Sequence, residues 1–132
     1  MSNLNTVQDI YAAFGAGDVP SILASLADDV DWEYGPGSTD VPWLQHRSGH
    51  NAVAGFFNSL SAVDIHKFAP KELLETDGVV VALIDVDFTV KATGKRVTEE
   101  DEIHVWRFNA DGKVARYRHG VDTHAAQLAI KP

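Results

Sequence analysis

The hydrophobic positions follow a helical spacing in the first half of the chain. Val7, Ile10, Tyr11 and Phe14 recur at intervals of three and four residues, which predicts an amphipathic helix. Gly15 and Gly17 are typical of its end. Residues 18–26 predict a second helix, with Asp18 as N-cap, Pro20 in the first turn and buried Ile22, Leu23 and Leu26. A third helix is expected from about Gly49 to Leu60, where Val53, Phe56, Phe57 and Leu60 share one face.

Strand patterns occupy most of the rest. Val30, Trp32 and Tyr34 alternate with acidic residues, which predicts a half-buried strand followed by a loop over 35–48. Residues 63–76 predict a weak, Pro-interrupted strand, and long strands are expected at 78–91, 96–108 and 113–122. A short helix or tail over 123–130 closes the chain. Alternating apolar positions in the 78–91 strand predict one face against the helices, formed by Val80, Ala82, Ile84, Val86, Phe88 and Val90. Three helices followed by consecutive antiparallel strands predict an α+β domain with helices on one face of a curved sheet.

Composition narrows the class of protein without naming a function. The 132 residues are expected to form a single domain, 1–132. The 19 acidic residues against 11 basic ones give a net charge of -8, which argues against nucleic-acid or anionic-membrane binding. The chain has no cysteine, so thiolate chemistry and disulfides are excluded. We expect a cytoplasmic protein, because the N-terminus lacks the pattern of a signal peptide and no apolar run is long enough to span a membrane.

Several stretches resemble one known superfamily. They are AGDVPSILASLADDVDWEY (16–34), RSGHNAVAGFF (47–57), HVWRFNADGKVARYR (104–118) and the final Val121-Asp122-Thr123. Together they resemble the nuclear transport factor 2-like superfamily, and within it the SnoaL-like and ketosteroid-isomerase-related proteins. The resemblance implies a cone-shaped curved antiparallel sheet wrapped around three N-terminal helices, a cystatin-like roll. It also implies a hydrophobic pocket on the concave face and a homodimer through the other face of the sheet.

The catalytic residues of the family are replaced in this chain. The resemblance places Tyr34 at the position of the ketosteroid isomerase base, and Ile10 and His104 at the positions of its two oxyanion-binding acids. It places His119 at the last-strand Asp of limonene-type epoxide hydrolases and of SnoaL-type cyclases. A histidine can transfer protons, so the resemblance still implies isomerase-like or cyclase-like chemistry, with these replacements in the catalytic positions.

The candidate site lies on the last two long strands. The resemblance favours His104 and Trp106 facing inward, whereas the apolar pattern favours Ile103 and Val105, and we expect the first set. Tyr117, His119 and Val121 share a face of the last strand, so His104, Tyr117 and His119 are expected in one patch. We predict His119, His104 and Tyr34 as catalytic residues, with the two histidines lowering each other's pKa. Substrate-binding residues are predicted to be Tyr11, Phe14, Trp32, Trp43, Phe57, Val86, Phe88, Trp106, Tyr117 and Val121.

Other polar features have a functional and a structural interpretation. Asp122 could polarise His119, but an N-cap for the last helix is the favoured role. In the acidic run 98–102, Glu100 or Glu102 could serve as a base at the pocket mouth, while pairing with Arg116 or Arg118 is favoured. His46 and His50 have the spacing of a zinc pair, but the sequence offers no third ligand, so we expect no metal and no cofactor.

Two functional hypotheses remain. The first is a cofactor-free isomerase, cyclase or lyase that transfers protons on a small apolar carbonyl or polycyclic compound. The alternative is a non-catalytic dimer that binds a small hydrophobic molecule or another protein.

Overall fold

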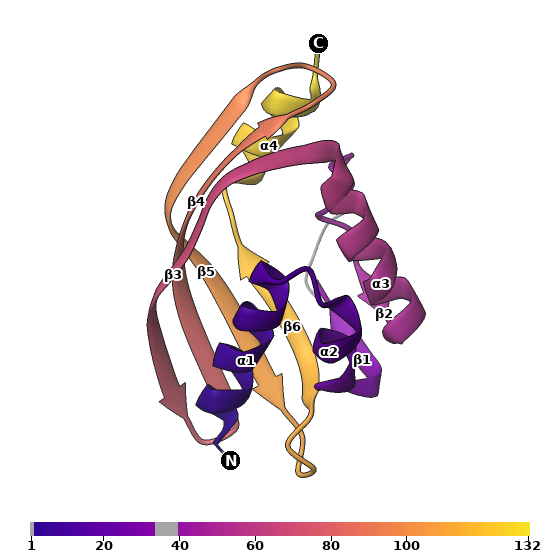
Figure 1. Cartoon of the computed structure of the whole chain (residues 1–132), viewed down its shortest axis with the longest axis vertical. Coiled ribbons are helices and arrows are strands. Elements are labelled where there is room, and N and C mark those ends of the chain that lie inside the picture. Colours follow the sequence, from indigo (N-terminus) through magenta and orange to yellow (C-terminus); the bar gives the residue numbers. More distant parts are fainter. Residues whose placement is uncertain (1, 34–39) are drawn as a thin grey trace.

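The helices of the protein gather on one side of a six-stranded sheet. The structure is a computed structural model that describes residues 2–33 and 40–132. The helical elements are α1 (Asn3–Gly15), α2 (Val19–Ala24), α3 (His50–Ser59), the 3-10 turn η1 (Leu60–Ala62) and α4 (Thr123–Ile130). The strands are β1 (Leu26–Trp32), β2 (Arg47–Ser48), β3 (Val63–Thr76), β4 (Val79–Val90), β5 (Arg96–Phe108) and β6 (Val114–Gly120). Figure 1 shows α1, α2 and α3 beside the curved long strands, with α4 at one end.

The sheet has the order β2-β1-β6-β5-β4-β3. Within the described residues, β1 and β6 run parallel and every other neighbouring pair is antiparallel, so the sheet is mixed where the sequence predicted an antiparallel one. This arrangement confirms the expected α+β class and the helices on one face. The site depends on one register in particular, because β5 and β6 pair with His104 directly opposite His119.

The element boundaries follow the sequence with a few differences. Strand β1 begins at Leu26, earlier than the alternation from Val30 indicated, and the predicted 35–48 loop contains the short strand β2. Strand β3 is continuous despite Pro70. It lies at the edge of the sheet, where a residue without an N–H is tolerated, and its register shifts after Pro70. Asp18 caps α2 by accepting a hydrogen bond from the backbone N–H of Ser21 at 3.2 Å.

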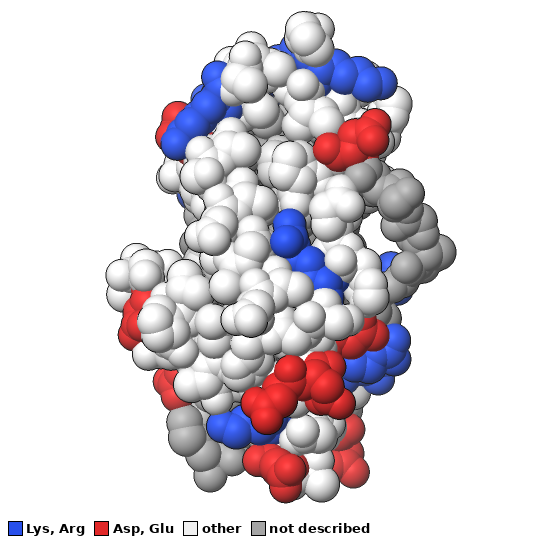
Figure 2. Space-filling model, turned by 90° about the vertical axis from the view of Figure 1, so that its right-hand side faces the viewer, with Lys and Arg blue, Asp and Glu red and all other residues white. Residues whose placement is uncertain are grey.

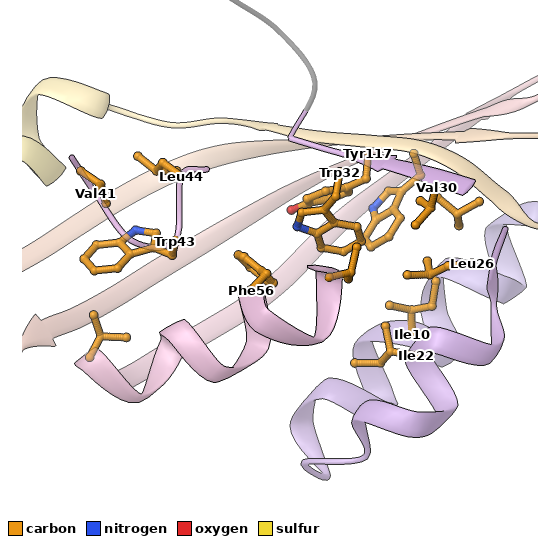
Figure 3. Packing of buried hydrophobic residues seen from close by; sticks show 14 of the residues in the cluster. Ile10, Ile22, Leu26, Val30, Trp32, Val41, Trp43, Leu44, Phe56 and Tyr117 are labelled. Atoms are coloured by element: carbon orange, nitrogen blue, oxygen red, sulfur yellow. The ribbon is translucent and has the colours of Figure 1, made fainter. Parts of the chain in front are cut away.

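The inner face of β4 forms the floor of the core. Val80, Ala82 and Ile84 are fully buried, as the alternating pattern predicted. The loop residues Trp43 and Leu44 fold back over the concave face and are 7% exposed. Figure 3 shows Phe56 of α3 lying between Trp43 and Trp32, so aromatic rings line the space between helices and sheet.

The outer surface carries most of the charge. On the convex face of the sheet, Asp87 is paired with Arg96, and Ile103 remains 42% exposed. A homodimer through this face stays a prediction. From the α3 side, most charged side chains gather toward the two ends of the molecule, and the middle shows a basic group surrounded by uncharged surface (Figure 2). No helix in the described part of the chain is long and apolar enough to cross a membrane.

Candidate active site

A partly open cavity of about 110 Å³ lies between the helices and the concave sheet face. All ten predicted substrate-binding residues line it, and so do His104 and His119. Tyr34, the third predicted catalytic residue, lies outside the described residues. The predicted set of substrate-binding residues omitted several further lining residues: Ile10, Ile22, Phe56, Leu60, Val63, Ile65, Phe68, Val97, Glu99, Glu102, Asp122 and Ala126.

Strand β5 turns its polar set toward the cavity. His104 is 4% exposed and Trp106 is 2% exposed, whereas Ile103 is 42% exposed. The face of β5 that carries His104 and Trp106 therefore points into the cavity, and the face that carries Ile103 points outward. Burial removes the polar groups of the imidazole and the indole from water, so these groups need hydrogen-bond partners inside the fold.

One hydrogen-bonded chain supplies those partners. The Trp106 Nε1–H donates to the Tyr11 hydroxyl oxygen at 3.0 Å, and that hydroxyl lies 2.8 Å from His104 Nδ1. His104 Nε2 lies 2.8 Å from a carboxylate oxygen of Glu102. With a neutral imidazole, the Tyr11 O–H donates to Nδ1 and the Nε2–H donates to Glu102. Both ring nitrogens of His104 are therefore occupied.

The second histidine is held by a carboxylate from another strand. Glu33 Oε1 accepts two hydrogen bonds from His119, one from the backbone N–H at 2.7 Å and one from Nδ1 at 2.5 Å. The His119 and Glu33 side chains are only 7% and 10% exposed. Because Glu33 fixes Nδ1–H, the other ring nitrogen, Nε2, is the one left for proton exchange with a ligand.

The two histidines face each other with opposite protonation preferences. Their ring centroids are 5.7 Å apart. Burial lowers the pKa of His104 below its ordinary value, and the hydrogen bond to Glu102 only partly offsets this. Burial also acts to lower the pKa of His119, but the hydrogen bond and negative charge of Glu33, with help from Glu102 and Glu99, raise it above the ordinary value. The prediction that each histidine lowers the other's pKa is confirmed for His104, whose pKa the charge of His119 helps to lower. For His119 the predicted direction is wrong, because the carboxylates outweigh the effect of burial.

Unusual backbone conformations place the carboxylates. Within the described residues, the non-glycine residues with positive φ are Glu33 (φ 57°) and Asp101 (φ 61°). Such conformations are uncommon for residues with a Cβ and concentrate at functional sites. At Glu33, the turn out of β1 brings the side chain back onto His119. At Asp101, the register of β4 with β5 shifts, so that Glu100 and Asp101 are both accommodated opposite Asp85.

This β-bulge explains why Glu99 and Glu102 both line the cavity. Residues three apart in a regular strand lie on opposite faces, and one extra residue reverses that relation. The bulge is fastened on the convex face, where Lys71 Nζ lies 2.9 Å from Asp85 and 2.6 Å from Asp101. Glu102 was given two sequence interpretations, and the structure turns it toward the cavity and His104 instead of Arg116 or Arg118. Glu100 is exposed.

The N-terminus of α4 closes one side of the cavity. Asp122 accepts a hydrogen bond from the backbone N–H of Ala125 at 2.9 Å, which confirms the favoured N-cap role. Its own backbone N–H donates to Glu99 at 2.8 Å. Burial, followed by the negative charges of Glu102 and Asp122, raises the pKa of Glu99 although the Asp122 N–H opposes the shift. The polarising partner of His119 is Glu33, not Asp122.

The remaining polar candidates do not form a metal site. His46 is bonded to Asp31, and His50 Nε2 lies 3.0 Å from the carbonyl oxygen of Leu26. Among the described residues, no three metal-ligating side chains come together. Trp32 is 2% exposed and lines the cavity, and its indole N–H has no acceptor in the described part of the chain.

Comparison with known proteins places this geometry in a family. The model of the SnoaL-like domain matches residues 7–117. The chain belongs to the SnoaL-like family. The SnoaL-like chain is 30% identical to an NTF2-like protein of unknown function from Burkholderia pseudomallei, with all of both chains covered and a TM-score of 0.84. An NTF2-like protein from Burkholderia xenovorans is 28% identical, covering 98% of this chain and 95% of that one, with a TM-score of 0.84.

A further similar structure holds an organic molecule. TerC, co-crystallized with polyporic acid, is 25% identical, with 98% of each chain covered and a TM-score of 0.82. No curated protein matches the SnoaL-like chain. The fold is therefore NTF2-like, as the sequence indicated, and the chemistry has to be argued from the cavity itself.

Sequence reasoning found the histidines and the aromatic walls but missed Glu33. Alternation along β1 placed attention on Trp32 and Tyr34, and Glu33 between them reads as a solvent-facing residue. The role of Glu33 depends on its positive φ, which the sequence pattern does not predict. The acidic run before His104 was the one available signal for Glu99 and Glu102, although it did not say which of its members face inward.

Proposed function

We propose that this SnoaL-like protein is a cofactor-independent proton-transfer enzyme that acts on a small, flat, largely apolar compound with an enolisable carbonyl. The observation that carries the proposal is the pair of buried histidines with opposite pKa shifts in one aromatic cavity. His119, with its raised pKa, supplies the acid, while His104, held neutral by burial, donates its Nε2–H to Glu102 and positions that carboxylate as the base.

His119 supplies the acid in this mechanism. Its raised pKa keeps the imidazolium populated near neutral pH, and Glu33 orients the ring through Nδ1. The Nε2–H then donates to the ligand carbonyl oxygen as an α C–H bond breaks. The electron pair of that bond forms the enol C=C, and the carbonyl oxygen takes the proton of His119.

Glu102 supplies the base, and His104 positions it. The Glu102 side chain is 10% exposed, lines the cavity and is held through one oxygen by His104 Nε2. His104 is itself fixed by Tyr11, so it acts through Glu102 and not directly on the ligand. Return of the proton from Glu102 to a different carbon, with the enol O–H proton passing back to His119, completes an isomerisation with no net change in atoms or electrons.

The size of the cavity limits the ligand. A dry protein cavity of roughly 150 Å³ binds benzene. The 110 Å³ available here encloses about one ring, and the opening lets the rest of a larger molecule extend toward solvent. The polyporic acid in TerC supports a small organic molecule as the ligand class for this cavity.

Deuterium exchange tests the proposed function. 2-Indanone, a flat ketone with acidic α C–H bonds, is incubated with the protein in ²H₂O, and loss of the α-proton signal is followed by NMR. The wild type is expected to exceed the buffer rate, and His119→Ala is expected to lose about 100-fold of the excess, a typical contribution of a positioned acid or base.

A matched control separates chemistry from folding. His46→Ala removes an exposed histidine that is also paired with a carboxylate, and it should retain the wild-type rate. Unchanged exchange in a His119→Ala variant that still unfolds cooperatively on heating would contradict the assignment. Binding of 2-indanone without any catalysed exchange would favour the alternative function, a non-catalytic small-molecule binder.

A further inference from the structure

The cavity contains more carboxyl groups than cationic groups, a property that the proton transfer alone does not explain. Glu99, Glu102 and Asp122 line it, and Glu33 lies behind His119. Among the described residues no lysine or arginine lines the cavity, so the two histidines are its basic groups. The local charge is therefore negative in a largely apolar enclosure.

Of the three described carboxyl groups that line the cavity, Glu102 is the buried one, at 8% exposed. His119 and Glu33 form an ion pair whose charges cancel. Glu102 has His104 as its partner, and burial disfavours the charged form of that imidazole. A buried carboxylate without a cation is costly, and the cost falls when a cation is brought next to it.

The walls beside Glu102 suit an organic cation. Tyr11 lies 5.9 Å from Phe68 and 5.8 Å from Trp106 between ring centroids, and all three rings line the cavity around His104. Faces of aromatic rings attract cations, and desolvation strengthens that attraction. The indole N–H of Trp32, which has no acceptor among the described residues, calls for an acceptor atom on a ligand and does not bear on the ligand's charge.

We propose that the natural ligand carries a positively charged nitrogen, as an amine, seated against Glu102 and the rings of Tyr11, Phe68 and Trp106. This inference rests on the proposed function of the same cavity and names its substrate class. The ammonium group accompanies the enolisable carbonyl, so His119 keeps its role as the acid that protonates the carbonyl oxygen.

Three fragments of similar shape test the proposal by calorimetry at pH 7. Benzylamine is a cation, benzyl alcohol is neutral and benzoate is an anion at this pH. Benzylamine is expected to bind at least about tenfold more tightly than benzyl alcohol, and benzoate is expected to bind least. Glu102→Gln should remove most of the preference for benzylamine over benzyl alcohol.

The control is Glu100→Gln, which makes the same charge change at an exposed residue of the same strand and should keep the wild-type preference. Equal affinity for the three fragments, tighter binding of benzoate, or no binding of benzylamine would overturn the proposal. Binding of the three fragments to the wild-type protein tests the proposal even if Glu102→Gln does not fold. Because no turnover is measured, a cation preference without deuterium exchange would refute the proposed function alone.

Discussion

Replacement of Glu33 by glutamine isolates the charge that holds His119. Glu33 Oε1 accepts hydrogen bonds from the backbone N–H and from Nδ1 of His119, at 2.7 Å and 2.5 Å. An amide oxygen in Glu33→Gln can still accept both bonds, so the shape of the site is retained while the negative charge is lost.

The expected cost follows from burial of the pair. Hydrogen bonds to charged groups contribute about 1.5–3 kcal/mol each, and breaking a buried ion pair costs about 3–5 kcal/mol. Since the amide oxygen retains part of the interaction, we expect Glu33→Gln to lose about 3 kcal/mol of unfolding free energy at pH 5.5. For a domain of this size that corresponds to about 10 °C in Tm.

The cost should depend on pH in a defined direction. The folded-state pKa of His119 is raised above its unfolded value. Its contribution to stability is therefore fully present below the ordinary histidine pKa and is lost as the pH rises through the raised folded value. The stability difference between wild type and Glu33→Gln should be larger at pH 5.5 than at pH 9.

Urea denaturation followed by tryptophan fluorescence at both pH values measures the difference. Asp31→Asn is the matched control, because it makes the same change beside the exposed His46 and should cost much less. An equal loss for Glu33→Gln at pH 5.5 and pH 9 would refute the reasoning from charge.

Substitutions at three further positions test the hydrogen-bonded chain, the bulge and the cap of α4. Tyr11→Phe leaves Trp106 Nε1–H and His104 Nδ1 unpaired and should cost about 1–3 kcal/mol in chemical denaturation, so an unchanged midpoint would count against the hydrogen-bonded chain. Asp101→Gly and Asp101→Val both remove the ion pair with Lys71, but glycine tolerates φ 61° and valine does not, so the valine variant should have the lower Tm; equal Tm values would show that the bulge is unstrained. Asp122→Ala removes the N-cap of α4 and should cost about 1 kcal/mol, seen as faster amide exchange in its first turn, and unchanged exchange would contradict the capping role.

The sequence predicted the elements well because their periods are strong. The apolar row of β4 and the helical spacing of α1 each extend over several repeats, so local irregularities do not obscure them. It was harder to predict which face of β5 lines the cavity, because the apolar pattern of this strand favoured Ile103 pointing inward. Burying His104 and Trp106 instead is possible only because Tyr11 and Glu102 satisfy them, and those partners are set by the tertiary fold.

The carboxylates of the site lay beyond what periodicity can predict. Glu33 and Glu99 reach their positions through positive φ at Glu33 and through the bulge at Asp101, and both break the alternation on which strand predictions rest. The pKa of His119 was misjudged for the same reason. Repulsion between two histidines could be foreseen from the β5 and β6 spacing, but the nearby carboxylate of Glu33 could not.

The central claim is that two facing histidines hold opposite protonation states in one cavity. NMR titration of the imidazole resonances of the wild-type protein, assigned with His104→Gln and His119→Gln, tests it directly. The account predicts that His119 titrates above the ordinary histidine value of about 6.5 and that His104 titrates below it or stays neutral throughout. Titration of both histidines together at about 6.5 would contradict it.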